Sequence, residues 1–388
     1  MKRTIFVTAI LVFFATVRVS SQGAYIPPDK PSLIVGIIIE QLRFDQLEKI
    51  RDHLGDNGIR RLINEGTSFR NASYAYLLTQ SAPGFATIAT GAEPSFHGIP
   101  SDNWYEPFNE ELIYCTKDVS VNPVGGSYEF GLHSPSRLSV STFSDELKLA
   151  SNMGSRAYGI GFSDQGAILG AGHSADGAFW FDERSGTWMS STYYMAELPA
   201  WLNDFNSLSL ADKYLSGTWD KLKEESYYSI SLPDSSVHEA GFSGRLIFPY
   251  DLDRMSLGTG LARRRDYSLL KETPFSNTLT TELAIRLIEE EELGMDEFTD
   301  YLSIVYSATD NIGHRFGPSS VEATDAIYRL DREIEQLLAY LNEKIGKRNI
   351  LVYFTAAHGV CEVPSVLDRV SIPSGYFRPN QAITLLRS

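Results

Sequence analysis

Long runs of apolar residues that end at polar residues are the clearest pattern in this chain. Residues 32–40 form such a run, rich in β-branched side chains, and it ends on the carboxylate of Glu40. Comparable apolar runs cover 157–162, 301–306 and 349–354. Because a strand buried on both faces of a parallel sheet reads as a continuous hydrophobic run, these segments predict strands of such a sheet.

Segments with helical periodicity alternate with these runs. The pattern predicts helices over 58–65, 277–292 and 320–345 and a helix that begins near Ser81, and it predicts a further strand around 67–76. Strands that alternate with helices are typical of the α/β class, here a doubly wound, mainly parallel sheet flanked by helices. In such folds the functional groups gather at the carboxyl edge of the sheet.

Regular periodicity fades between about 180 and 274, where aromatic residues and serines are frequent. We expect this interval to form an irregular cap or insertion over the strand ends, within one α/β domain covering 22–388. Its aromatic residues, Trp180 and Trp188 among them, either line a substrate pocket or pack the insertion onto the core, and packing is the simpler interpretation.

Residues 1–21 have the three parts of a secretory signal peptide: a basic start, an apolar run from Ile5 to Val17, and small residues before Gln22. The apolar run is too short for a membrane span, and the alternative interpretation is a buried first strand. We therefore expect a protein without a membrane span that is exported to the periplasm or the cell exterior.

The chain is acidic, with 34 basic and 49 acidic residues and a net charge of −15. This charge argues against a nucleic acid polymer as partner. It also repels anionic ligands at long range, so a phosphate-ester site would need local positive charge. The sequence does not determine whether the two cysteines, Cys115 and Cys361, pair or form two separately buried thiols.

Polar residues suited to metal or phosphoryl chemistry follow several of the predicted strands. Glu40 ends one strand, Asp310 and His314 follow another, His358 follows a third, and Ser81 opens a helix. A carboxylate and an imidazole four residues apart are ligand types that zinc prefers, although each residue alone is more often structural. The glycine just before His314 indicates a loop for this pair.

Six separated segments, in the same order, resemble motifs of the alkaline phosphatase superfamily: 36–43, 81–84, 90–99 with 103–105, 167–176, 310–317 and 355–359. Within it the chain is most similar to the bacterial phosphate-irrepressible alkaline phosphatases, relatives of the type I phosphodiesterases and nucleotide pyrophosphatases. The resemblance runs from about Pro31 to Ser388. It implies an alkaline phosphatase-like fold and a two-zinc hydrolase in which a serine or threonine attacks the phosphorus of a small phosphate ester.

Carried over position by position, the resemblance assigns roles to six residues of this chain. Ser81 stands at the position of the nucleophile, and Asn103 at that of an asparagine that contacts a phosphoryl oxygen. The positions of metal ligands are occupied by Glu40, Asp310, His314 and His358. Glu40 replaces an aspartate, so its carboxylate reaches further from the backbone.

Three other positions depart from the family pattern. Ala357 stands where the family has an aspartate ligand, and Ser163 and Gln165 stand where it has a lysine and an arginine that contact the substrate. A further histidine ligand of the family belongs to a C-terminal segment that we expect to be missing here. We therefore expect one or none of the two zinc sites to be fully occupied.

These departures leave two expectations for function. The first is an exported zinc-dependent phosphate mono- or diester hydrolase with reduced or no activity. The second is a non-catalytic pseudoenzyme that binds a phosphoryl ligand or a protein on the same scaffold. A serine hydrolase of the catalytic-triad type is disfavoured, because the motif Gly-x-Ser-x-Gly does not occur in the sequence.

Overall fold

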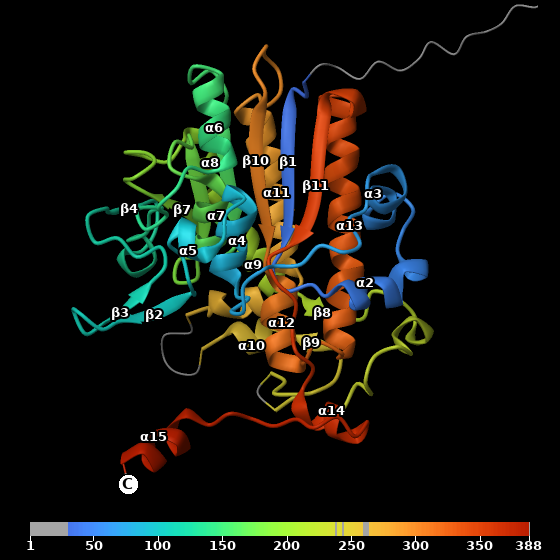
Figure 1. Ribbon diagram of the computed structural model, residues 1–388. Coiled ribbons are helices and arrows are strands. Elements are labelled where there is room, and N and C mark those ends of the chain that lie inside the picture. The colour runs from blue at the N-terminus through green and yellow to red at the C-terminus, as the bar shows by residue number, and fades with distance from the viewer. Residues whose placement is uncertain (1–29, 237–238, 243, 259–263, 388) are drawn as a thin grey trace, which may run out of the picture. The chain divides into compact units, whose positions relative to one another are not determined.

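A mainly parallel sheet with helices on both faces forms the centre of the structure (Figure 1). In the described part of the chain this sheet has seven strands, in the order β11-β1-β10-β5-β6-β7-β4. The strands are β1 (Leu33–Ile39), β4 (Pro123–Val124), β5 (Ala157–Gly161), β6 (Gly177–Asp182), β7 (Thr187–Ser191), β10 (Asp300–Tyr306) and β11 (Ile350–Ala356). The strands from β11 to β6 in this order are parallel, and β7 and β4 add antiparallel pairings. The predicted doubly wound α/β fold is confirmed.

The computed structural model describes residues 30–236, 239–242, 244–258 and 264–387. The predicted signal peptide, residues 1–21, lies outside these residues. Pro31–Ser388 form one compact unit. Among the helices of the described chain, none combines the length and the hydropathy needed to cross a membrane.

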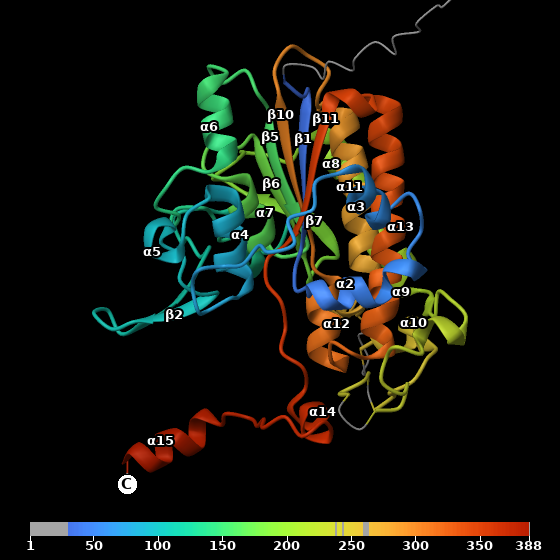
Figure 2. The same cartoon turned by 45° about the vertical axis from the view of Figure 1, so that its right-hand side comes forward.

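Two layers of helices cover the sheet (Figure 2). One face carries α4 (Ser81–Thr90), α6 (Phe143–Ala150) and α7 (Asp164–Ala171), and the other carries α8 (Ala200–Ser207), α11 (Phe275–Glu290) and α13 (Val321–Lys344). Further helices are α2 (Phe44–Ile50), α3 (Ile59–Glu65), α5 (Pro94–His97), α9 (Leu210–Leu215), α10 (Leu252–Ser256), α12 (Ala308–Phe316), α14 (Pro364–Arg369) and α15 (Pro379–Arg387). Two small two-stranded antiparallel sheets pair β2 (Asn103–Glu106) with β3 (Glu111–Tyr114) and β8 (Thr218–Trp219) with β9 (Tyr250–Asp251).

Most elements expected from the hydrophobic pattern are present. The four apolar runs are β1, β5, β10 and β11, and the helices expected before and after them are α3, α4, α11 and α13. The strand expected around 67–76 is wrong, because these residues form turns and bends and most of their side chains are exposed. Phe69, for example, is 82% exposed, so the segment lacks the buried face that would hold it in a sheet.

The interval 180–274 begins inside the main sheet, because it includes the end of β6 and the whole of β7. Trp180 and Trp188 on these strands are buried, and the indole of Trp180 donates a hydrogen bond to the carbonyl of Phe130. In its described residues, the later part has short helices and the two-stranded sheet of β8 and β9. Its Trp219 donates to Asp325 of α13 at 2.8 Å. These aromatic side chains therefore pack the core.

The two cysteines are not bonded to each other. Cys115 is buried and Cys361 is exposed, and both are free thiols. The expectation that two separate thiols would both be buried therefore holds only for Cys115.

Candidate functional site at the carboxyl edge of the sheet

Three neighbouring strands end at the same level and bring the candidate residues together. In the parallel register, Ile39 at the end of β1 lies opposite Tyr306 of β10 and Ala356 of β11. The residue that follows β1 is Glu40. Its backbone N–H donates to the carbonyl of Tyr306, and its carbonyl accepts from the Thr309 hydroxyl at 2.6 Å. The start of α12 is therefore fixed beside the end of β1 (Figure 1).

Ser81 and His358 form a direct hydrogen-bonded pair at this edge. Ser81 is the first residue of α4 and is 7% exposed, and its Oγ lies 3.1 Å from Nε2 of His358. The Nδ1 atom of His358 lies 2.7 Å from the carbonyl oxygen of Gly359. Because a carbonyl oxygen only accepts, we assign the proton of the neutral ring to Nδ1. Nε2 is then free to accept the hydrogen bond of the Ser81 hydroxyl.

Asp310 and His314 form a second pair, one turn apart on α12. Oδ1 of Asp310 lies 3.3 Å from Nε2 of His314, and this contact raises the pKa of the imidazole. The expectation of a loop for this pair is wrong, because Ala308–Phe316 is a helix that includes Gly313. The glycine serves a close approach instead: a Cβ atom at Gly313 would lie 2.5 Å from Oε1 of Gln41.

Gln41 lies between the members of this second pair, and the sequence analysis did not single it out. Its Nε2 donates to Oδ1 of Asp310 at 2.7 Å and lies 3.4 Å from Nε2 of His314. Its backbone has a φ of 59°, in the left-handed region that residues other than glycine rarely adopt. The only sequence signal was its place next to Glu40.

Glu40 is buried within the same group of residues. Burial raises the pKa of its carboxyl group to about 8, and the charge of Asp310 acts in the same direction. Nε2 of His358 lies 4.0 Å from Oδ1 of Asp310. The structure therefore places Glu40, Ser81, Asp310, His314 and His358 around one point of the sheet edge.

Ala357 follows β11 and has no exposed surface. It packs in an apolar cluster with Ile38, Ala82 and Phe85, against the first turn of α4. The contact is close enough that a Cβ atom at Gly84 would lie 2.3 Å from the carbonyl oxygen of Ala357. The position that would carry a carboxylate in the family is thus an apolar contact between β11 and α4.

Ser163 and Gln165 lie at the start of α7 and are engaged in local hydrogen bonds. Ser163 is the N-cap of α7, and its Oγ accepts from the backbone N–H of Gly166. The side-chain amide of Gln165 donates to the hydroxyl of Tyr114 at 2.9 Å. Neither side chain carries a charge, so this turn brings no positive charge to the site.

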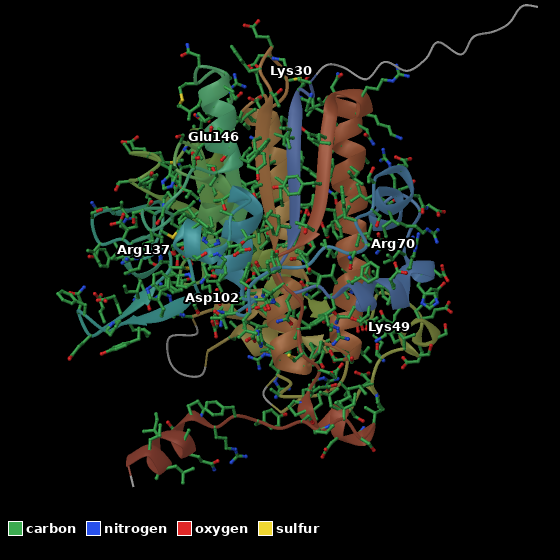
Figure 3. All side chains as sticks on the ribbon, viewed as in Figure 1. Lys30, Lys49, Arg70, Asp102, Arg137 and Glu146 are labelled. Atoms are coloured by element: carbon green, nitrogen blue, oxygen red, sulfur yellow. The ribbon has the colours of Figure 1, made fainter. Side chains whose placement is uncertain are left out.

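The residue that reaches the start of α4 from the turn before β2 is Asp102. Its Oδ1 accepts a hydrogen bond of 2.8 Å from the backbone N–H of Ala82. Figure 3 labels Asp102 among the side chains of this region. Burial raises the pKa of the Asp102 carboxyl group, whereas the hydrogen bond from the backbone N–H of Ala82 lowers it. Asn103, which we expected here, is exposed and begins β2. Asp102 was missed because the sequence alone does not show which of two adjacent polar residues faces α4.

The described donor groups do not fit a pair of bound zinc ions. In the described part of the chain, no group of three or more His, Cys, Asp and Glu side chains has an arrangement that could hold a metal ion. Asp310 and His314 lie close together, but the amide of Gln41 donates to the Asp310 oxygen that a cation would need. The apolar side chain of Ala357, beside His358, supplies no donor atom.

Comparison with known proteins identifies the family of this chain. The family model for type I phosphodiesterases and nucleotide pyrophosphatases matches residues 34–388. The chain belongs to this family.

Curated relatives within this family include two alkaline phosphatases. The chain is 39% identical over 348 residues to alkaline phosphatase PhoV of Synechococcus elongatus, which covers 89% of the chain and 62% of PhoV. It is 38% identical over 355 residues to alkaline phosphatase PafA of Elizabethkingia meningoseptica, which covers 90% of the chain and 63% of PafA. The chain thus spans less than two thirds of the length of either relative.

The fold of this family is also shared with a solved structure of PafA. Wild-type PafA matches with a TM-score of 0.85 at 36% identity, covering 91% of the chain and 67% of PafA. A PafA variant matches with a TM-score of 0.86. In that variant a threonine is replaced by serine, and an asparagine, a lysine and an arginine are replaced by alanine.

Proposed function

We propose that this chain is an exported member of the family that binds phosphate esters beside Ser81 and hydrolyses them only weakly. The observation that carries this proposal is the hydrogen bond of 3.1 Å between Ser81 Oγ and His358 Nε2 at the start of α4. It joins a nucleophilic hydroxyl to a group that can take its proton. The family membership and the similarity to PhoV and PafA support the choice of a phosphate ester as substrate class.

The chemistry available to these residues is a phosphoryl transfer to Ser81. The Ser81 oxygen forms a bond to phosphorus while Nε2 of His358 accepts the hydroxyl proton. The bond from phosphorus to the ester oxygen breaks, and that oxygen leaves with the electron pair and takes a proton from water. Water then has to displace Ser81 from the phosphoserine to complete hydrolysis.

Weak activity follows from the three departures in the site. Ala357 removes one carboxylate, and Ser163 and Gln165 remove two positive charges from the neighbourhood of the phosphoryl group. Removing a single preorganised electrostatic group from an active site costs about 100- to 1000-fold in turnover. Because the donors do not fit two zinc ions, we derive no step that depends on zinc.

Replacement of Ser81 tests the proposed role of this residue. Purified protein is incubated with an aryl phosphate monoester and with an aryl diester, each with and without added zinc. We expect slow turnover that Ser81→Ala abolishes and that Ser207→Ala, an exposed serine of α8, leaves unchanged. Turnover that persists in Ser81→Ala would contradict the role of Ser81.

Non-catalytic binding of a phosphoryl ligand or a protein is the second candidate, because the described donors do not fit a metal pair. The triple variant Ala357→Asp, Ser163→Lys, Gln165→Arg separates the two candidates. If the site is a weakened hydrolase, turnover should rise by at least about 100-fold, and the zinc content measured by mass spectrometry should rise with it. Ligand binding by the wild type without turnover in either protein would favour the binding function.

A further inference from the structure

Asp102 makes three hydrogen bonds near the start of α4, one through its carboxylate and two through its backbone. Its Oδ1 accepts from the N–H of Ala82 at 2.8 Å. Its own backbone N–H donates to Oε1 of Gln80 at 3.1 Å, and its carbonyl accepts from the N–H of Cys115 at 3.1 Å. The two backbone bonds fix the position of the Asp102 main chain beside α4, and the carboxylate gives up the bond to Ala82 if it turns away.

The first N–H groups of a helix are the natural partners of a phosphoryl oxygen. Ala82 directly follows Ser81, so an ester whose phosphorus is within reach of the Ser81 hydroxyl would place an oxygen near the N–H of Ala82. In this chain that N–H already bonds the carboxylate of Asp102. A bound ester therefore meets a negative charge where it would otherwise find a donor.

The surroundings of Asp102 do not compensate for this charge. The acidic side chains of Asp310, Asp164 and Glu40 interact electrostatically with its carboxylate, and the nearby imidazole of His358 is the neutral proton acceptor described above. Repulsion between like charges at contact distance is strong in a partly buried site. It grows with the charge of the ligand, so a phosphate monoester with two negative charges is penalised more than a diester with one.

We propose that Asp102 is a specificity-determining residue that directs this site away from phosphate monoesters and toward phosphodiesters. This inference rests on the proposed function, because it assumes that phosphate esters bind beside Ser81. The inference distinguishes the two classes of substrate, monoesters and diesters, by the number of negative charges on the phosphoryl group.

The test compares two phosphonate ligands that differ by one charge and lack a good leaving group, so that binding is measured without turnover. Phenylphosphonate carries two negative charges in alkaline buffer, and its monomethyl ester carries one. Their dissociation constants are measured by calorimetry for the wild type and for Asp102→Asn. The asparagine keeps an oxygen that can accept from Ala82 but removes the charge.

We expect the wild type to bind the methyl ester about tenfold more tightly than phenylphosphonate, and Asp102→Asn to remove this preference. The control Asp204→Asn removes an exposed charge on α8, on the opposite face of the sheet, and should leave the preference unchanged. A purely structural role of Asp102 would lower the melting temperature of Asp102→Ala without any change in the ligand ratio.

Two outcomes would overturn the inference in distinguishable ways. If both ligands bind and Asp102→Asn leaves their ratio unchanged, Asp102 does not set the specificity, while the proposed function stands. If neither ligand binds the wild type or the variant, the proposed function itself fails, and the inference fails with it.

Discussion

Single close contacts determine how the polar groups at the sheet edge are held. Gly84 lets the first turn of α4 touch the backbone after β11, and Gly313 lets Gln41 reach Asp310. In both places a glycine inside a helix is explained by a neighbour from a distant part of the chain. The geometry of Ser81 and His358 depends on the first of these contacts.

Replacement of Gly84 by alanine should therefore destabilise the protein. The added Cβ would lie 2.3 Å from the Ala357 carbonyl oxygen, which belongs to the backbone and cannot move aside cheaply. We expect the free energy of unfolding to fall by about 1–3 kcal/mol, measured by urea denaturation. Gly217→Ala is the control, because its Cβ would lie 3.5 Å from the nearest atom. Equal stability of the two variants would contradict this packing.

The sequence predicted the main ligand-type residues of the site but missed those defined by side-chain direction. Glu40, Asp310 and His358 could be predicted because each follows an apolar strand, and strand ends of a parallel sheet meet at one edge. Gln41 and Asp102 could not, because a glutamine beside a glutamate and an aspartate beside an asparagine have no distinctive pattern. Which of two adjacent side chains faces the site depends on the turn that carries them.

Among the helices and strands, long buried segments could be predicted from the sequence, whereas short segments with both apolar and polar residues could not. The apolar runs of β1 and β10 are too long and continuous for a solvent-exposed segment, so the sequence predicts that both strands are buried. β7, which lies in the interval expected as a cap, was not predicted. Its five residues, Thr187–Ser191, are too few for their pattern to be distinguished from that of a loop. The helix α12 was missed because a glycine there was interpreted as a loop signal.

Contacts between the segment at Glu239 and α13 should make stability depend on pH. Both carboxylate oxygens of Glu239 are buried, and among the described residues neither has a hydrogen-bond partner. Burial, with the nearby charges of Glu322 and Asp234, raises the pKa of Glu239 to about 8. Since the unfolded carboxyl group has a pKa of 4.5, only the folded state holds this proton between the two values.

The free energy of unfolding should therefore decrease as pH rises from about 4.5 to about 8, by up to about 1.4 kcal/mol per pH unit from this group. Glu239→Gln should show a smaller decrease and be more stable than the wild type at the upper end of the range. Urea denaturation across the range checks this, with the exposed Glu343→Gln on α13 as control. A variant whose pH profile equals that of the wild type would contradict the burial of this group.

At the scale of the whole molecule, charge and site chemistry oppose each other. The chain carries a net charge of −15, yet its proposed ligands are anions. The turn that begins α7 supplies neutral Ser163 and Gln165, so no positive charge there offsets the repulsion. Binding must therefore include electrostatic work that depends on the salt concentration.

Added salt should consequently increase activity toward a phosphate monoester. The screening length falls to about 8 Å at physiological ionic strength, so the repulsion between the acidic molecule and a doubly charged ester weakens. We expect kcat/KM to rise by roughly two- to tenfold between low and physiological salt, and to rise less for a singly charged diester. A decrease of kcat/KM with salt would instead reveal a positively charged approach to the site.

The order of strands in the sheet has a consequence for how the chain is made. β1 is synthesised first, but both of its neighbours, β10 and β11, lie beyond residue 299. Roughly 260 residues separate the end of β1 from the start of β10. At a synthesis rate of about 5–20 residues per second, their synthesis takes about 13 to 50 seconds. During that interval the nascent apolar segment has no native surface to cover it. We expect newly made chains to depend on chaperones that hold this segment until β10 and β11 have been synthesised.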